Sequence, residues 1–408
     1  MTEEEIKKYL ELTSQKEALE DLIGHINTAQ QGCLNVWKTG FSYLDDMLDG
    51  GFLGGNLILL GAVSSLGKTT FALQIADNIA AAGQDVLIFS LEMTKKELNA
   101  KSISRNTFLL TDDDDDIMKR TRQEYRLTMG DILRGRVGLL GEEKRKLFDE
   151  AFDLTSRLND HIFILRDNDI SVDNVAQLVQ THKEARNGRK PFVIIDYLQI
   201  LKPSEGSTGK RSGDKRMLTD EDVNKLKDLA VKQDVPIMVI SSFNRASYLD
   251  PVSMGSFKES GTIEYSGDVL IGLQYSGMRY QKHYFTNKNG KKTTVFESKI
   301  EHDTRVRMLL DRMDEWGSEG YFLPIDVVLM KNRGVGKGRA LFEFCPKYNI
   351  YKEMSILGNK QKNKDLDDRY NWNREANIDE SGSNGTGDSQ SAGESSSVVS
   401  SEGSRGVV

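Results

Sequence analysis

The stretch GAVSSLGKTT, Gly61–Thr70, decides the fold of this 408-residue chain. It follows the apolar run 57–60 and precedes FALQIADNIAAAG (71–83), which has helical periodicity and ends in glycine. A strand, a glycine-containing turn and a helix in this order form a phosphate-binding loop. Its backbone N–H groups and the helix N-terminus surround the anion. The sequence therefore predicts a nucleotide-binding loop.

The loop matches the phosphate-binding pattern at every position but the first. Its spacing is Ala62-x4-Gly67-Lys68-Thr69, and the glycine that usually opens the pattern stands one position earlier, as Gly61. We expect Lys68 to reach the β and γ phosphates of ATP and Thr69 to ligate Mg²⁺. The competing interpretation is a glycine-rich turn with an ordinary lysine. The predicted nucleotide-binding residues are Ala62, Ser64, Ser65, Gly67, Lys68, Thr69 and Thr70.

Short apolar runs alternate with helical segments from residue 56 onward. Several are almost continuous in Val, Ile and Leu, which favours strands covered by helices on both faces and hence an α/β fold with a mainly parallel sheet. A second helix is predicted at 172–188. The predicted strands are 56–62, 85–92, 161–167, 191–197, 235–242, 268–274 and 325–331.

Two acidic residues end predicted strands. We expect Asp196, in FVIIDY, to hold Mg²⁺ through water beside the loop; the alternative is an aspartate that caps a turn. Glu92, in SLEM, could orient and deprotonate the attacking water; the alternative is a surface glutamate at a helix start.

A basic segment, KNRGVGKGR (331–339), follows the last predicted strand. Lys331 and Arg333 alternate, so we expect them to share a face. A guanidinium suits a γ-phosphate, and such an arginine can act across a subunit interface. The alternative is a solvated basic turn.

Composition limits the class of protein. The net charge of −7 argues against a generally basic nucleic-acid-binding surface. No apolar run approaches the ~20 residues of a membrane helix, and no secretory pattern is present. Cys33 and Cys345 make no disulfide framework. We therefore expect a cytoplasmic protein without a membrane partner.

The chain is predicted to have three parts: an N-terminal helical region (1–30), a core (31–355) and a polar, largely disordered tail (356–408). The helix at 3–28 has an apolar face that docks either on its own core or on a neighbouring subunit. Residues 203–217 are predicted to form a loop. Residues 275–320 form an insertion with a hairpin turn at 287–292. Its interleaved basic and aromatic residues could bind a single strand, or the hairpin could simply be solvated: Arg279, Tyr280, Lys282, Tyr284, Phe285, Lys288, Lys291 and Lys292.

Seven stretches, taken in order, resemble the C-terminal motor domain of DnaB-like replicative DNA helicases, which has the RecA-like P-loop NTPase fold. They are KTGFSYLDDMLDGG, SSLGKTT, FSLEM, VIIDYLQIL, SSFNR, SFKESGTIEYSGDVLI and KNRG, and the resemblance covers roughly residues 31–353. It implies a homo-oligomeric ring, a hexamer, that hydrolyses ATP between subunits with Mg²⁺ and passes single-stranded DNA through its channel.

The resemblance also implies roles at the matching positions. The catalytic set is Lys68, Glu92, Lys331 and Arg333, of which the last two reach the neighbouring subunit's site. The metal contacts are Thr69 and Asp196. The loop that tracks the DNA backbone contains Lys258, Glu259 and Gly261.

Two departures from the family pattern affect what is expected. Ser242 stands where the family usually has a glutamine that senses the γ-phosphate, which puts the coupling of hydrolysis to DNA movement in question. The family also carries a globular N-terminal domain that binds primase, whereas about 30 residues precede the motor here. One interpretation is that the helix at 3–28 corresponds to the family's linker helix, which packs on the adjacent subunit; ring assembly would then be retained and primase docking in its usual form would not. A helicase loader or a primase is a candidate partner.

Three functions remain open from the sequence. The first is an ATP-driven, ring-forming helicase or translocase in replication, with a leaning towards a phage, plasmid or integrated element. The second is a RecA-like recombinase or mediator ATPase, and the third a nucleotide-gated DNA- or partner-binding module with weak hydrolysis. The complete nucleotide set favours the first: Lys68, Thr69, Glu92 and Asp196.

Overall fold

A computed structural model describes most of the chain: residues 2, 15–30, 35–112, 119, 121–139, 141–166, 170–196, 215–257, 265–286 and 292–354. The chain divides into two units, Met1–Asn363 and Lys364–Val408, and all the described residues belong to the first. The predicted tail, Cys33 and the DNA-tracking residues Lys258, Glu259 and Gly261 lie outside the described residues.

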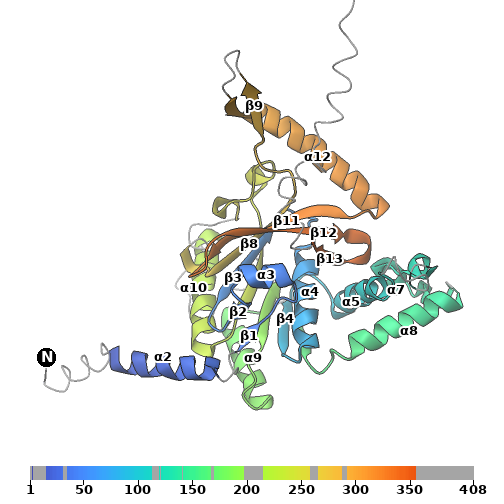
Figure 1. The fold of residues 1–408 in the computed structure, drawn as a ribbon. Helices are drawn as coiled ribbons and strands as arrows, with labels where there is room; N and C mark the ends of the chain where they lie inside the picture. The colour runs from blue at the N-terminus through green and yellow to red at the C-terminus, as the bar shows by residue number, and fades with distance from the viewer. Residues whose placement is uncertain are drawn as a thin grey trace, which may run out of the picture. The chain divides into compact units, whose positions relative to one another are not determined.

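The centre of the fold is a nine-stranded sheet (Figure 1). In spatial order its strands are β13 (Ile350–Glu353), β12 (Gly338–Cys345), β11 (Leu323–Asn332), β8 (Val269–Tyr275), β3 (Leu57–Ala62), β7 (Ile237–Ser242), β6 (Phe192–Asp196), β4 (Val86–Ser90) and β5 (Ile162–Leu165). From β8 to β5 every neighbouring pair is parallel. The prediction of a mainly parallel sheet is confirmed, and all seven predicted strands are present.

One side of the sheet is antiparallel, which the prediction of a mainly parallel sheet allows. The predicted strand at 325–331 is part of β11, which pairs antiparallel with β8. β12 and β13, which were not predicted, continue this antiparallel edge. A continuous apolar run reports that both faces of a strand are covered and says nothing about its direction.

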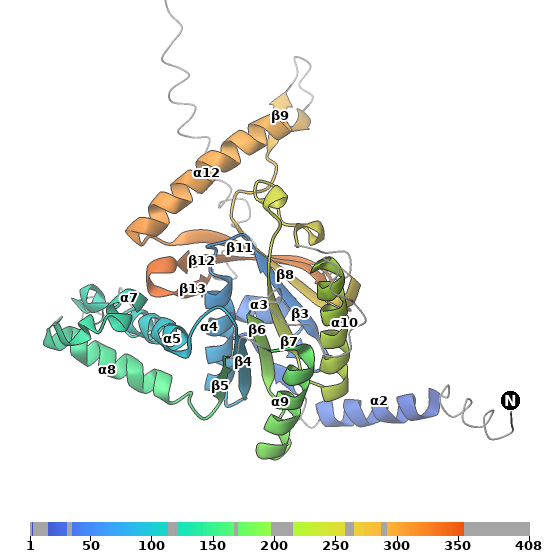
Figure 2. The same ribbon diagram turned by 180° about the vertical axis from the view of Figure 1, so that it is seen from behind.

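Helices cover both faces because strand side chains alternate between them. Leu57, Leu59, Val193 and Val239 belong to a core cluster beneath α9 (Val172–Ala185) and α10 (Lys215–Gln233). The intervening residues face α4 (Lys68–Ala81) and α5 (Lys95–Leu109). Figures 1 and 2 show these two helix pairs on opposite sides of the sheet. Since α10 starts at residue 215, the predicted loop 203–217 is wrong at its last three positions.

The remaining elements surround this core. N-terminal to β3 lie α2 (Gln15–Gln30), β1 (Val36–Trp37), α3 (Ser42–Met47) and β2 (Phe52–Leu53). Between α5 and β5 lie η1 (Gln123–Tyr125), α7 (Met129–Leu133), η2 (Arg136–Leu139) and α8 (Glu142–Ser156), and β7 is followed by η4 (Arg245–Ser247) and η5 (Met254–Ser256). The insertion contains β9 (Lys282–Thr286), β10 (Lys292–Phe296) and α12 (Lys299–Glu319), and η6 (Pro346–Tyr348) joins β12 to β13. None of the described helices is long and apolar enough to cross a membrane.

Candidate nucleotide-binding site

The phosphate loop lies between β3 and α4, at the carboxyl end of the central strand. Ser65 and Gly67 both have left-handed backbone conformations, with φ of 68° and 69°. Left-handed residues in such a turn direct successive N–H groups into one concavity, which suits an anion. A Cβ on Gly67 would lie 2.5 Å from the Phe344 ring, so both conformation and space require glycine. Ala62 is tolerated because it is still a paired strand residue, opposite Ser242 and Leu273.

The Lys68 side chain curls back over the loop. Its Nζ donates to the carbonyl oxygens of Ala62 and Val63, each at 3.2 Å. Burial lowers the pKa of this ammonium, while the negative charges of Asp196 and Glu92 oppose the shift. A phosphate in the concavity would offset the cost of burying this cation.

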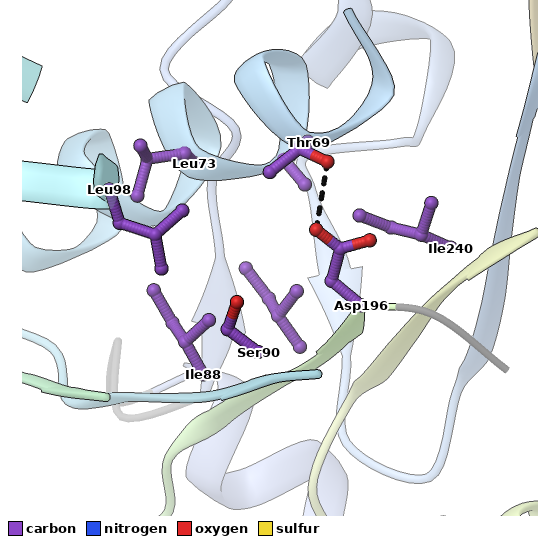
Figure 3. Close-up of a pocket in the computed structure, with 9 residues that line it drawn as sticks. Thr69, Leu73, Ile88, Ser90, Leu98, Asp196 and Ile240 are labelled. Atoms are coloured by element: carbon purple, nitrogen blue, oxygen red, sulfur yellow. Dashed lines mark hydrogen bonds between the residues drawn. The ribbon is translucent and has the colours of Figure 1, made fainter. Parts of the chain in front are cut away.

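Thr69 and Asp196 meet directly although they are far apart in the sequence. Thr69 Oγ1 donates to Asp196 Oδ2 at 2.8 Å. Figure 3 marks this bond with a dashed line. Asp196 ends β6 and is 3% exposed. Burial raises its pKa to about 6; the hydrogen bond from Thr69 opposes this shift and the charge of Glu92 adds to it. The cavity beneath this pair, about 10 Å³, could hold one water molecule and is too small for a nucleotide.

Glu92 lies on the turn that follows β4. Ser90 Oγ donates to the Met93 carbonyl at 2.8 Å and shapes this turn, and Thr94 then begins α5 with a capping box. Ser90, the last residue of β4, pairs with Asp196, the last residue of β6. Because these two strands end level with each other, Glu92 and Asp196 both lie at the carboxyl end of the parallel sheet. The Glu92 carboxylate is exposed, and its charge acts on both Lys68 and Asp196.

Ser242 ends β7 and sits beside the loop, because β7 neighbours β3. The predicted residues Ser64 and Ser65 are exposed on the loop, and Ser64 Oγ lies 3.4 Å from the Tyr248 hydroxyl. Thr70 is buried in the first turn of α4. The structure therefore brings the predicted phosphate-loop residues, Glu92, Asp196 and Ser242 to one edge of the sheet.

The sequence did not predict a role for Lys101, which lies on α5 near the phosphate loop and links this helix to α4 and to the turn before β13. Its Nζ donates to Thr70 Oγ1 at 3.0 Å and to Asn349 Oδ1 at 2.9 Å. Burial lowers its pKa to about 8, and the charge of Arg105 contributes. The TKKE stretch at 94–97 signals a helix start, but no local pattern in the sequence connects Lys101 with a residue of the β12–β13 turn.

A second missed feature supports the loop from behind. The Tyr351 hydroxyl donates to the Leu66 carbonyl, and the Tyr351 ring stacks on Phe344 with centroids 4.3 Å apart. Gln74, on α4, bonds both backbone groups of Tyr351. The antiparallel edge of the sheet therefore supports the conformation of the phosphate loop.

Lys331 and Arg333 come together, as predicted, but away from this site. Lys331 Nζ and Arg333 Nη2 both donate to the Tyr265 carbonyl, at 3.2 and 3.1 Å. Arg333 also forms an ion pair with Asp268, with Nε 3.3 Å from Oδ1. The other Asp268 oxygen accepts from the Leu57 N–H and from Lys227.

The register of the sheet shows where this basic pair lies. Ala62 is level with Leu273 on β8, whereas the Arg333 N–H bonds the carbonyl of Asp268, before β8 begins. The five-residue difference corresponds to about 17 Å along the strands. Lys331 and Arg333 therefore lie far from the phosphate loop of their own chain, towards the opposite ends of the parallel strands.

Residues 37–353 match the family model of the DnaB-like helicase C terminal domain. The replicative DNA helicase DnaB of Helicobacter pylori J99 is 25% identical over 358 residues, 84% of this chain and 65% of that protein. That of Geobacillus stearothermophilus is 29% identical over 265 residues, covering 64% of this chain and 50% of that protein. The chain thus spans less than two thirds of the length of these curated relatives.

Two solved structures share the fold. One, described as the ATPase domain of G40P, superposes with a TM-score of 0.61 at 22% identity, over 84% of this chain and 99% of that one. The other, a DnaB-like replicative helicase described with its interactions with primase, gives a TM-score of 0.60 at 22% identity, over 84% and 67%. These likenesses confirm the predicted fold class.

Proposed function

Because the chain belongs to the family of DnaB-like helicase C-terminal domains, which are P-loop NTPase domains, we propose that it uses ATP hydrolysis to move along single-stranded DNA. One observation carries the proposal. The carboxyl ends of the parallel strands carry the predicted nucleotide-binding and catalytic residues Lys68, Thr69, Glu92 and Asp196. The cations Lys331 and Arg333 lie towards the opposite ends of these strands. A second copy of the chain would bring the missing cations to each nucleotide.

The residues at the loop suit a magnesium nucleotide. Mg²⁺ prefers hard oxygen ligands, and the Thr69 hydroxyl and the Asp196 carboxylate already lie together. Asp196 is buried with a raised pKa, so a nearby cation would favour its ionised form. When bound, Mg²⁺ would neutralise charge on the β and γ phosphates. Thr69 would hold it directly and Asp196 through water.

Glu92 is the group we assign as general base. Its carboxylate is exposed on the turn after β4, near enough to Lys68 and Asp196 to influence both their pKa values. A carboxylate at this point can accept a proton from water that attacks the γ-phosphate. The Lys68 ammonium would exchange its loop carbonyl partners for phosphate oxygens.

Arg333 and Lys331 would act on the ATP of a neighbouring subunit. Their place at the opposite edge of the sheet supports an arrangement in which each site is completed in trans. Head-to-tail contacts of this kind close into rings, here a hexamer by resemblance to the family. Apolar side chains of α2 are exposed and offer a face for a neighbour: Leu19, Leu22, Ile23 and Ile26.

DNA binding is assigned to the loop that contains Lys258, Glu259 and Gly261. The flanking residues are described: Phe257 is buried, and Tyr265 supplies the carbonyl that holds Lys331 and Arg333. A lysine repeated around a ring would follow phosphates without reading sequence. A helicase loader or a primase would be a further partner, and one similar structure is described with primase.

Steady-state ATP hydrolysis with and without single-stranded DNA tests this function, with Lys68→Ala as the blank. Strong stimulation by DNA supports a motor. Equal rates of hydrolysis with and without DNA would mean that hydrolysis is no longer coupled to DNA binding, and Ser242 would be the first residue to examine. No hydrolysis above the blank, with nucleotide still bound, would instead favour a nucleotide-gated binding module.

A further inference from the structure

We propose that the paired strands β9 and β10, with the segment 279–281 that leads into them, form a second binding site for single-stranded DNA, separate from the predicted loop at 258–261. The inference rests on the proposed function, since its ligand is the strand on which the motor acts. The hairpin and α12 belong to the insertion at 275–320 and lie at the top of Figure 1.

Side chains of α12 hold the base of the hairpin. His302 Nε2 lies 2.8 Å from the Met278 carbonyl, and the His302 ring stacks on Tyr280 with centroids 3.9 Å apart. Arg305 donates to the carbonyls of Gly277 and Arg279 and pairs with Glu297. α12 therefore fixes the angle at which the strands leave the sheet, and a ligand would meet a preformed surface.

The charge of this segment contrasts with that of the whole chain. The described residues of this segment, 279–286 and 292–296, include Arg279, Lys282 and Lys292 and no Asp or Glu, within a chain of net charge −7. The acid that follows, Glu297, is already neutralised by Arg305 and accepts the Gln281 N–H. A local excess of positive charge on an acidic protein favours a polyanion over an ordinary protein surface.

The hairpin also presents an aromatic ring, that of Phe296, to solvent. Lys282 and Phe296 are directly opposite each other in the ladder, and Lys282 Nζ lies 5.3 Å from the ring centroid. Phe296 is 58% exposed. Arg279, before β9, is exposed as well. Cations beside an exposed ring can hold phosphates while a base stacks, without preference for sequence.

α12, which holds the hairpin, also contacts the segment that leads to the predicted DNA loop. Lys299, at the start of α12, pairs with Asp250 at 3.0 Å. Asp250 belongs to the segment 243–257, which leads directly to Lys258. The insertion and the predicted loop would therefore act on the same strand.

The test is the salt dependence of binding of a fluorescent oligothymidine, measured by anisotropy without nucleotide. Arg279→Ala/Lys282→Ala should reduce the slope of log K against log[salt] by about 1.4, since each phosphate contact to a single strand contributes about 0.7. Phe296→Ala should weaken binding roughly fivefold or more through lost stacking. The matched control, Arg145→Ala/Lys146→Ala, removes two half-exposed cations from α8 and should leave the slope unchanged.

These outcomes separate the inference from the function on which it rests. Wild-type slope and affinity in both hairpin variants would overturn the inference, and the basic face would then fit an acidic protein partner. If Lys258→Ala still abolished binding in that case, the proposed motor would stand. If the wild-type protein bound no single-stranded DNA, the proposed function and the inference would both fail. Unchanged melting temperatures confirm that the variants are folded.

Discussion

Among single residues, Asp196 has the most unusual environment at the candidate site. Its carboxyl is almost fully buried, and it accepts a hydrogen bond from Thr69. The pKa of Asp196 is about 6 in the folded protein and 3.8 ordinarily, so ionising this carboxyl lowers the free energy of unfolding of the nucleotide-free protein. The stability that comes from the protonated carboxyl is fully present below about pH 4 and is lost as the pH rises to 6. A bound cation would reverse the penalty by stabilising the carboxylate.

The pH dependence of Mg²⁺-assisted nucleotide binding follows from this shift. Protonated Asp196 cannot support the metal, so we expect the Mg²⁺-dependent affinity for an ATP analogue to fall about tenfold between pH 7 and pH 5. Fluorescence titrations with and without Mg²⁺ measure this difference. Asp196→Asn should bind weakly at every pH. If that variant kept the same pH profile, another group would be responsible.

Arg333→Ala should abolish ATP turnover while a single subunit still binds ATP, because the guanidinium lies at the far edge from its own phosphate loop. Lys227→Ala is the matched control, since Lys227 shares the Asp268 carboxylate with Arg333 but has no assigned catalytic role. It should keep most of the turnover. Equal losses in both variants would point to Asp268 and the fold rather than to chemistry in trans.

At the scale of structural elements, β12 and β13 support the phosphate loop, and the sequence did not predict this. Gly67 lies against the ring of Phe344, more than 270 residues further along the chain. The Phe344 ring in turn stacks on Tyr351. The periodicity of the apolar runs predicted each strand, because burial on both faces is a local property of composition. It could not predict which strands would be neighbours, since sheet order is set by packing between distant segments.

Gly67→Ala tests this support. The added Cβ would meet the Phe344 ring, and the left-handed φ adds strain of about 1–3 kcal/mol, so we expect a lower melting temperature and loss of nucleotide binding. Gly83→Ala separates the two causes, because Gly83 has φ of 79° and an alanine Cβ there would have no other atom within 4 Å. It should show the strain alone and keep nucleotide affinity. Adding Phe344→Ala to Gly67→Ala should recover part of the binding.

At the scale of the whole molecule, sites completed in trans predict complementation between two inactive variants. Lys68→Ala and Arg333→Ala subunits, each inactive alone, should together recover up to about a quarter of wild-type turnover. Random mixing places an intact Lys68 against an intact neighbouring Arg333 at that share of interfaces. Turnover is measured over a range of mixing ratios. Recovery absent at every ratio, in rings shown to be mixed, would contradict a trans arrangement.

The sequence by itself determined the phosphate loop, the seven strands and the order of the family's stretches. These depend on local features: turn chemistry at Gly67, apolar runs, and acids at strand ends. The tertiary structure alone decided the direction of β11, the contact of Lys101 with Asn349, and the separation of Arg333 from Lys68. The physical reason is that these depend on the order and register of strands distant in the chain, and residue periodicity carries no information about either.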